Sequence, residues 1–282
     1  MISTLENTTQ MALRQSIIEI ARLAGAAILH VYHANDLGVE IKSDDSPLTR
    51  ADIASHKIIV NALAKLDPEL PVLSEESSQD EVAQRRNWKR FWLVDPLDGT
   101  KEFIKRNGEF TVNIALVENG QALLGVVYVP VSGNCYSGSA AEGAFLSTAE
   151  QAEQQIRVRV PAATPPVVVG SRSHASPRVQ EYLENLGAHQ LTAMGSSLKL
   201  CLVATGEADL YPRLGPTMEW DTAAAHAIVQ AAGGRVIGTD GADLNYNQRD
   251  TLLNPEFIVL GDQQVNWQEF IPNGPGHMDR TD

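Results

Sequence analysis

The stretch that decides the fold of this chain runs from Phe91 to Thr100 and reads FWLVDPLDGT. Its first four residues, Phe91 to Val94, are apolar and flanked by turn formers, which is typical of a buried β-strand. The strand delivers Asp95 at its end, and Asp98 follows after a short turn. Two carboxylates at this spacing can point at one place, with the carbonyl of Leu97 as a third oxygen. Hard oxygens of this kind favour Mg²⁺.

The other residues of this segment suit phosphate chemistry. Pro96 stiffens the turn, and Gly99 lets the backbone approach a phosphate that accepts N–H groups from the start of the next element. Thr100 then places a hydroxyl beside the metal. The alternative is a plain surface turn, because Asp, Pro and Gly dominate turns for local reasons.

Two further acidic segments argue against a plain surface turn. Leu73-Ser74-Glu75-Glu76 follows an apolar approach, and Glu219-Trp220-Asp221 stands immediately before an Ala-rich helix that we expect over residues 222–232. Each segment taken singly has a simpler interpretation: Glu75 and Glu76 as a solvated pair in a loop, and Asp221 as the N-cap of the following helix. A site for two cations needs carboxylates from separate segments. The residues that meet this need are Glu75, Asp95, Asp98 and Asp221.

On the N-terminal side, apolar residues at helical spacing predict amphipathic helices over residues 11–31 and 50–66. Residues 110–117 and 122–129 are β-rich and are joined through Asn119-Gly120, a strong hairpin signal. The first half is therefore predicted to contain an antiparallel sheet.

Strands and helices alternate from about Pro161 onward. We predict strands over residues 167–170 and 208–211 and helices over 176–186, 197–205 and 222–232. The polar and proline-rich stretch between residues 147 and 166 marks a boundary. The expected division is an N-terminal α+β half (1–155) with most metal ligands, a C-terminal α/β half (156–271) that closes the site, and a mobile tail (272–282).

Composition narrows the class of protein further. Apolar residues make up 43% of the chain and charged residues 20%, as in ordinary globular proteins. A net charge of −13 disfavours a nucleic-acid polymer as partner. No apolar stretch is long enough for a transmembrane helix, and the N-terminus lacks a secretory pattern. With only Cys135 and Cys201 present, far apart, a cytoplasmic location is expected.

The acidic segments also carry a family resemblance over nearly the whole chain. Together with Lys42-Ser43-Asp44 and Asp52, they resemble the Mg²⁺-dependent, lithium-sensitive inositol monophosphatase superfamily. The continuation Lys101-Glu102-Phe103 is similar to that of the CysQ-type 3′(2′),5′-bisphosphate nucleotidases, because inositol phosphatases typically continue with a Thr-Asn-Phe-like sequence. Three more segments resemble the nucleotidase branch: residues 171–174, 195–199 and 211–213.

This resemblance implies an α/β (α+β) fold, a layered αβαβα sandwich with the site between its halves. It implies hydrolysis of 3′-phosphoadenosine 5′-phosphate to AMP and phosphate, with 3′-phosphoadenosine 5′-phosphosulfate as a second substrate. The alternatives are an inositol or sugar monophosphatase with the same metal site, and a non-catalytic nucleotide-binding protein. Oligomeric state stays open, and peripheral contact with the inner face of the membrane is an additional expectation.

The resemblance also implies roles for individual residues. One Mg²⁺ is expected on Glu75, Asp95 and the Leu97 carbonyl, a second on Asp95, Asp98 and Asp221, and a third, looser ion near Glu75. Asp52 and Thr100, with Glu75, would activate the attacking water. The expected substrate contacts are Glu75, Leu97, Asp98, Gly99, Thr100, His174, Ser196, Lys199, Arg213 and Asp221.

Two of these assignments have simpler alternatives. Asp52 could be only a first-turn acid favoured by a helix dipole. Lys199 and Arg213, expected on the 5′-phosphate, could be solvated surface charges. Lithium is expected to inhibit by taking one Mg²⁺ position.

Overall fold

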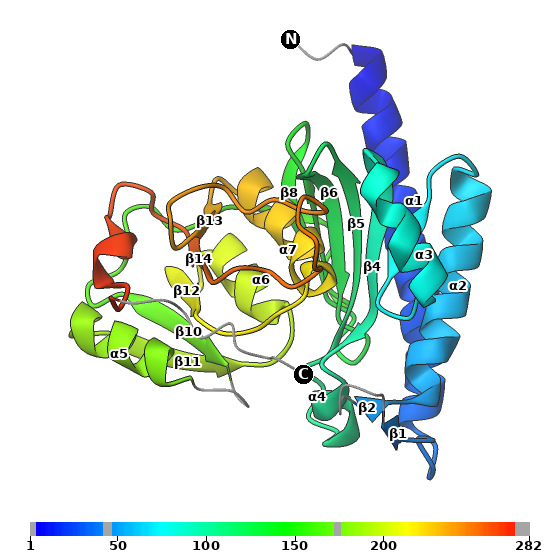
Figure 1. The fold of residues 1–282 in the computed structure, drawn as a ribbon, viewed down its shortest axis with the longest axis horizontal. Coiled ribbons are helices and arrows are strands. Elements are labelled where there is room, and N and C mark those ends of the chain that lie inside the picture. The colour runs from blue at the N-terminus through cyan, green and yellow to red at the C-terminus, as the bar shows by residue number, and fades with distance from the viewer. Residues whose placement is uncertain (1–3, 42–46, 172–175, 274–282) are drawn as a thin grey trace.

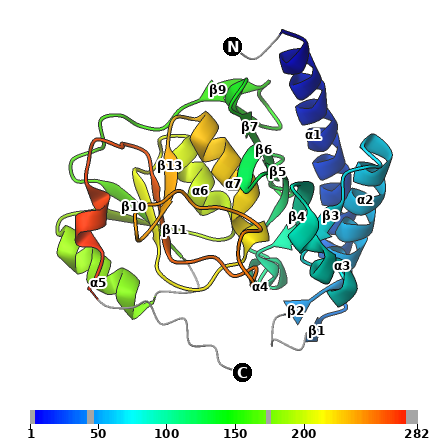
Figure 2. The ribbon, with the colours of Figure 1, turned by 45° about the horizontal axis from the view of Figure 1, so that its top comes forward.

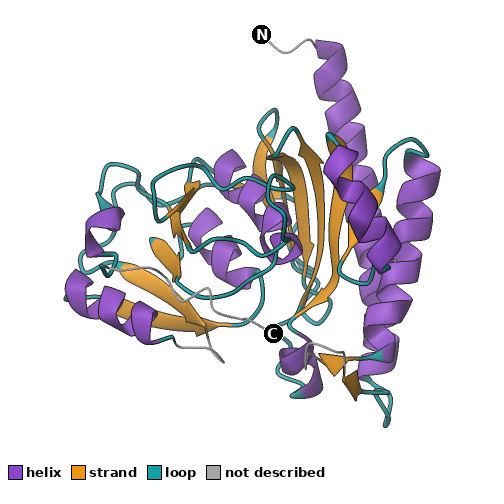
Figure 3. Cartoon of the chain, in the orientation of Figure 1, coloured by secondary structure: helices purple, strands orange, loops and turns teal. Residues whose placement is uncertain are grey.

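The structure, a computed structural model, describes residues 4–41, 47–171 and 176–273, which form five layers (Figure 1). Helices α1 (Thr4–Tyr32) and α2 (Arg50–Leu66) cover the outer face of a seven-stranded sheet. Helices α6 (Leu198–Ala204) and α7 (Glu219–Ala231) lie between this sheet and a five-stranded sheet. Helix α5 (Pro177–Leu186) covers the far face of the smaller sheet (Figure 3). The expected αβαβα sandwich is confirmed.

The larger sheet has the strand order β3-β4-β5-β6-β7-β8-β9. All neighbours are antiparallel except β3 and β4, which run parallel. At the predicted β5–β6 hairpin, Asn119 and Gly120 have φ of 50° and 82°. Both angles are positive, as the tight turn of a two-residue hairpin requires. The strands are β3 (Val72–Ser74), β4 (Arg90–Asp98), β5 (Thr111–Glu118), β6 (Gln121–Tyr128), β7 (Cys135–Ser139), β8 (Gly143–Ser147) and β9 (Gln154–Ile156).

The smaller sheet has the order β11-β10-β12-β14-β13. Strand β10 is parallel to both its neighbours, β11 and β12, whereas β14 is antiparallel to both of its own, β12 and β13. The chain passes from the larger sheet to the smaller one between β9 and β10. The strands are β10 (Val167–Ser171), β11 (Gln190–Met194), β12 (Leu210–Arg213), β13 (Arg235–Gly238) and β14 (Phe257–Leu260).

Short elements complete the described chain (Figure 2). They are β1 (Glu40–Ile41), β2 (Pro47–Leu48), α3 (Gln79–Gln84), η1 (Arg85–Asn87), α4 (Thr100–Ile104) and η2 (Trp267–Phe270). None of the helices in the described part of the chain combines the length and apolarity that crossing a bilayer needs.

Both faces of β4 are buried, which explains its continuous apolar run. Trp92 and Val94 pack under α1 and α2, whereas Phe91 and Leu93 pack toward α6, α7 and the smaller sheet. A strand covered on both faces needs apolar residues at consecutive positions rather than at alternate ones. Each face of β4 thus belongs to its own hydrophobic core, and a third core lies beneath α5 and η2.

Two element boundaries differ from the sequence-based expectation at the positions that matter for the site. Strand β4 continues through Asp98, because Asp95 pairs with Asn113 and Asp98 with Thr111 on β5, around an irregularity in the ladder. Helix α7 begins at Glu219 rather than Thr222, so Asp221 lies inside its first turn and not before it. Of the two helices predicted on the N-terminal side, α1 begins at Thr4 rather than at residue 11, and α2 has the predicted bounds.

Some sequence features lie outside the described residues. They are Lys42-Ser43-Asp44, His174 and the end of the predicted tail, residues 274–282.

The middle layer makes a close backbone contact that can be tested by mutation. A Cβ on Gly125 of β6 would lie 2.0 Å from the carbonyl oxygen of Ala224 on α7. We therefore expect Gly125→Ala to lower the free energy of unfolding by about 2–3 kcal/mol, because α7 must move away from the sheet. Chemical denaturation measures this change.

Gly215→Ala is the matched control, since a Cβ there would meet no atom within 4 Å. Equal stability of the two variants would contradict the close approach of α7 to β6.

Candidate metal and active site

Three carboxylates converge where β4 meets α7. Ligand oxygens of Asp95, Asp98 and Asp221 all lie within 4.8 Å of one another. Glu75 follows β3, and its N–H donates to the carbonyl of Val94 on β4 over 3.1 Å. Because β3 and β4 run parallel, their carboxyl ends meet, and Glu75 comes to lie beside Asp95. All four acids line one cavity of about 290 Å³.

The two aspartates of β4 are held by their own strand and by α6. Asp95 Oδ1 accepts a hydrogen bond from the N–H of Leu97 over 3.0 Å. Asp98 Oδ2 accepts from the N–H of Ser197 over 2.6 Å, and the Ser197 hydroxyl lies 2.6 Å from the same oxygen. Asn113 of β5 donates to this hydroxyl over 2.8 Å. The irregular end of β4 is therefore held by its own backbone at Leu97, by Ser197, and by Asn113 of β5 through Ser197.

Gly99 follows Asp98 with φ of 93°, in the left-handed region that favours glycine. A Cβ there would lie 3.1 Å from the carbonyl oxygen of Glu109. This conformation turns the chain from β4 directly into α4, so that Thr100 begins the helix at the cavity wall.

Asp221 is held by the turn that precedes it. Its Oδ2 accepts from the Thr217 hydroxyl over 2.6 Å and from the N–H of Met218 over 2.9 Å. The Ser197 hydroxyl also lies 2.5 Å from the backbone carbonyl oxygen of Asp221. Ser197 thus touches the Asp98 and Asp221 segments at once.

The electrostatics of this cluster call for a cation. Burial raises the pKa of Asp95 well above its usual range, and the charges of Glu75, Asp98 and Asp221 raise it further. Burial, followed by the charge of Asp221, raises the pKa of Asp98 to about 6, although Lys199 and Ser197 act in the opposite direction. Several carboxylates in a buried site repel one another unless positive charge is bound between them. A set made only of carboxylate and carbonyl oxygens fits Mg²⁺.

The predicted pair of Asp52 and Thr100 is brought together by α2 and α4. The Thr100 hydroxyl lies 3.4 Å from Asp52 Oδ1 and 3.4 Å from the Leu97 carbonyl oxygen. The other oxygen of Asp52 accepts from the N–H and the hydroxyl of Thr49, over 2.8 and 2.5 Å. Burial raises the pKa of Asp52, and the charge of Glu76 adds to the effect. Asp52 is thus a first-turn acid of α2 that also reaches the cavity residue Thr100.

The basic residues expected to bind substrate line the same cavity. Lys199 is only 7% exposed, and its Nζ donates to the Ser196 carbonyl oxygen over 2.5 Å, so it is no solvated surface charge. It also lies 5.7 Å from the centre of the Tyr211 ring. Arg213 is partly buried and donates to the carbonyl of Pro216. Gly99, Thr100 and Ser196 line the cavity as well.

Sequence reasoning missed the side chains that hold the acids in place: Thr49, Asn113, Ser197 and Thr217. The spacing of Thr49 and Asp52 is that of a helix capping box and could have indicated their contact. Asn113 is a polar interruption of an apolar strand, which is a weaker signal. Ser197 and Thr217 act on partners that only the fold brings close.

Comparison with known proteins gives a consistent result. The model of the inositol monophosphatase family matches residues 9–270. The chain is 55% identical over 245 residues to the 3′(2′),5′-bisphosphate nucleotidase CysQ of Escherichia coli O157:H7, covering 86% of this chain and 97% of that protein. It is 34% identical over 244 residues to the protein of that name from Haemophilus influenzae, covering 86% and 91%.

Solved structures show the same fold. CysQ from Bacteroides thetaiotaomicron, described as a bacterial member of the inositol monophosphatase family, superimposes with a TM-score of 0.79 at 43% identity. The match covers 89% of this chain and 97% of that one. The extragenic suppressor protein suhB from Bartonella henselae matches with a TM-score of 0.75 at 24% identity, covering 94% and 100%, and supports the fold alone.

The burial of Asp98 and its repulsion by Asp221 predict an unusual effect of removing the charge of Asp98. The pKa of Asp98 is higher in the folded protein than its ordinary 3.8, so its contribution to stability is present below pH 3.8 and is lost as pH rises through about 6. With chelator at pH 7.5, Asp98→Asn should therefore have a free energy of unfolding about 1–3 kcal/mol higher than that of the wild type. It should also unfold at a higher temperature. At pH 4.5 the difference should shrink.

Adding Mg²⁺ should then stabilise the wild type more than Asp98→Asn, because the variant lacks an expected ligand of one of the two ions. Asp80→Asn, which alters an exposed acid on α3, should behave like the wild type at every pH. Thermal melts with chelator or with Mg²⁺ measure both effects. A metal-free Asp98→Asn protein that is less stable than the wild type at pH 7.5 would contradict the repulsion.

Proposed function

This chain belongs to the inositol monophosphatase family, and we propose that it is a 3′(2′),5′-bisphosphate nucleotidase acting on 3′-phosphoadenosine 5′-phosphate. The products are AMP and phosphate, and 3′-phosphoadenosine 5′-phosphosulfate is a second substrate. One observation carries the proposal: the acidic cluster and the two bases Lys199 and Arg213 line a single cavity. That combination suits a molecule with one phosphate to be cut and a second to be held. Two curated relatives that are 55% and 54% identical to this chain over 245 residues bear this name.

The residues proposed to hold Mg²⁺ supply oxygen ligands only. Glu75, Asp95 and the carbonyl of Leu97 would hold one ion, and Asp95, Asp98 and Asp221 a second. A third, looser ion would lie near Glu75. When bound, Mg²⁺ lowers the pKa of water and neutralises charge on the leaving oxygen. Asp95 belongs to both sets, and we propose that it would help to hold both ions.

Asp52 and Thr100 are proposed to orient the attacking water and remove its proton. A hydroxyl that donates to a carboxylate keeps its lone pairs free to accept from water. As the proton of water passes to the Thr100 oxygen, the Thr100 proton passes to Asp52 Oδ1, 3.4 Å away. The raised pKa of Asp52 makes its carboxylate a better proton acceptor.

The far side of the cavity is proposed to select the nucleotide. Lys199 and Arg213 supply local positive charge to the 5′-phosphate in a chain whose net charge is −13. Tyr211 and Phe257 line the same cavity with their rings edge to face at 6.2 Å. The two residues are 3% and 0% exposed, so they support the cavity wall behind Lys199, whose Nζ lies 5.7 Å from the centre of the Tyr211 ring. Residues 1–155 then supply most metal ligands, and residues 156–271 close the site over the substrate.

The first test measures phosphate release from 3′-phosphoadenosine 5′-phosphate and from inositol 1-phosphate, each with Mg²⁺ and with chelator. We expect release from the nucleotide only, and only with Mg²⁺, with inhibition by Li⁺. Asp95→Asn should abolish turnover while the protein stays folded. Preference for inositol 1-phosphate would support the sugar phosphatase alternative, and absence of turnover on both would support a binding protein.

A second test concerns the proton path. Thr100→Val removes the hydroxyl that links water to Asp52 and should lower kcat by about 10²–10³-fold. Thr100→Ser keeps the hydroxyl and should retain most of the activity. Stabilisation by Mg²⁺ should be similar in both variants, which a thermal melt shows. Equal kcat of the Val and Ser variants would rule out a role for the hydroxyl.

A further inference from the structure

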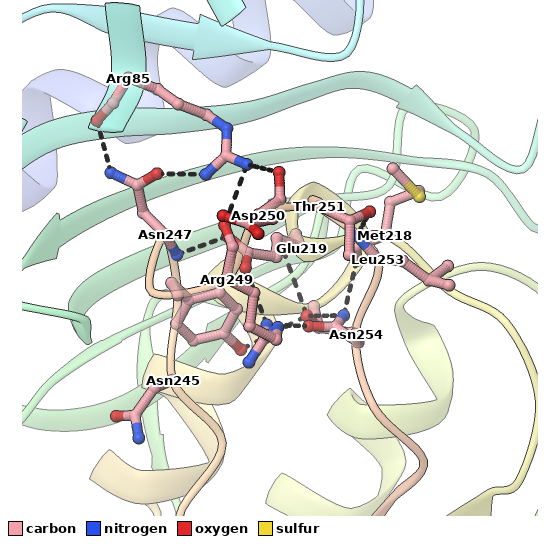
Figure 4. A network of polar contacts seen from close by, with 12 residues as sticks. Arg85, Met218, Glu219, Asn245, Asn247, Arg249, Asp250, Thr251, Leu253 and Asn254 are labelled. Atoms are coloured by element: carbon pink, nitrogen blue, oxygen red, sulfur yellow. Dashed lines mark hydrogen bonds and ion pairs between the residues drawn. The ribbon is translucent and has the colours of Figure 1, made fainter. Parts of the chain in front are cut away.

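The loop from Asn247 to Asn254 packs against the first turn of α7, the helix that carries Asp221 (Figure 4). The contact is made through backbone groups at the start of α7 and just before it. The N–H of Glu219 donates to the Leu252 carbonyl over 2.9 Å, and the N–H of Asn254 donates to the Thr217 carbonyl over 2.9 Å. The Asn254 side chain also donates to the Met218 carbonyl over 2.8 Å.

A buried ion pair locks the loop and the helix together. The Glu219 side chain is 0% exposed, and its Oε1 accepts from Arg249 Nη2 over 2.7 Å. Its Oε2 accepts from the N–H of Asn247 over 2.7 Å. The same Arg249 nitrogen lies 3.3 Å from Asn254 Oδ1. Both oxygens of Glu219 are therefore used to hold the loop, and this residue does not line the cavity.

Arg85 of η1 joins this network from the opposite side (Figure 4). It is 3% exposed and donates to Asn247 Oδ1 over 2.6 Å and to the Asp250 carbonyl over 2.8 Å. The Asn247 side chain returns a bond to the Arg85 carbonyl over 2.7 Å. Because Arg85 follows Glu75 in the chain through α3, the network connects the segment of Glu75 with that of Asp221.

This bracing acts where repulsion would otherwise open the site. Asp221 is held by Thr217 and Met218, and both of these residues are bonded to the loop through their carbonyls. Its carboxylate stands within 4.8 Å of those of Asp95 and Asp98. Without these contacts, like charges at this distance would push the first turn of α7 away while no cation is bound.

We propose that Glu219, Arg249 and Asn254 are positioning residues, which hold Asp221 close to Asp95 and Asp98 and so set the affinity of the site for divalent cations. The inference rests on the metal site of the proposed function and not on its substrate. Removing one of these contacts would let Asp221 move away from Asp95 and Asp98. Binding a cation would then have to bring the helix turn back, which lowers the affinity. Partners that orient metal ligands commonly change affinity by about 10- to 100-fold when removed.

The test uses Arg249→Met and a matched variant elsewhere. The Arg159–Asp209 pair has an N–O distance of 2.8 Å and side chains 33% and 0% exposed, against 2.7 Å and 28% and 0% for Arg249–Glu219. Arg249→Met should raise the Mg²⁺ concentration for half-maximal thermal stabilisation about tenfold. Arg159→Met should lose comparable stability and keep the wild-type Mg²⁺ midpoint.

Calorimetric titration of metal-free protein with Mg²⁺ gives the same comparison without substrate. Arg249→Lys keeps the charge and should recover most of the affinity. At saturating Mg²⁺, kcat and the KM for nucleotide of Arg249→Met should lie within about twofold of wild type, because the chemistry itself is untouched.

Glu219→Gln is the second variant, used where Arg249→Met does not fold, because it keeps an acceptor for the N–H of Asn247. A wild-type Mg²⁺ midpoint in the folded variant, or an equal shift in Arg159→Met, would overturn the positioning role. Absence of stabilisation of the wild-type protein by Mg²⁺ would contradict the proposed metal-dependent function. It would also contradict the present inference. A wild type that binds Mg²⁺ but cuts no nucleotide would refute only the substrate assignment.

Discussion

Mutual repulsion among Asp95, Asp98 and Asp221 is the constraint on which the rest of this site depends. Their oxygens lie within 4.8 Å of one another, and burial makes the repulsion stronger than it would be in water. Each carboxylate is therefore fixed by donors from its surroundings, such as the N–H of Leu97 or of Met218. The result is a set of oxygens held in place for a cation, so little reorganisation is needed when it binds.

The layered fold supplies the rigidity that this arrangement needs. Asp95 and Asp98 belong to β4, which is covered on both faces, and Asp221 belongs to α7, which packs on the same sheet. The close approach of Gly125 to the α7 backbone leaves little room for that helix to shift. On the other side of α7, the loop from Asn247 to Asn254 is bonded to its first turn. Ligands from two layers can thus share one ion.

The cavity combines opposite charges in a way that a phosphate ester requires. Its acidic wall attracts cations, while Lys199 and Arg213 line the same space, with Lys199 Nζ 5.7 Å from the centre of the Tyr211 ring. The buried ammonium of Lys199 also counteracts part of the negative field at Asp98. The bisphosphorylated nucleoside of the proposed function matches this division, because one phosphate would lie on the acidic side and the other beside the bases.

The sequence by itself determined the elements whose signals are local. Helical spacing gave α2 its bounds, Asn119-Gly120 gave the β5–β6 turn, and the apolar run before Asp95 indicated a buried strand. The acidic segments predicted a cluster of carboxylates, and Asp95, Asp98 and Asp221 do converge; their role as metal ligands stays a proposal. Only the tertiary structure decided that β4 continues through Asp98, that α7 begins at Glu219, and that Arg85 meets Asn247. These features depend on pairing with β5, on the loop that caps α7 and on contacts between residues far apart in the chain, and no local periodicity or turn preference encodes such contacts.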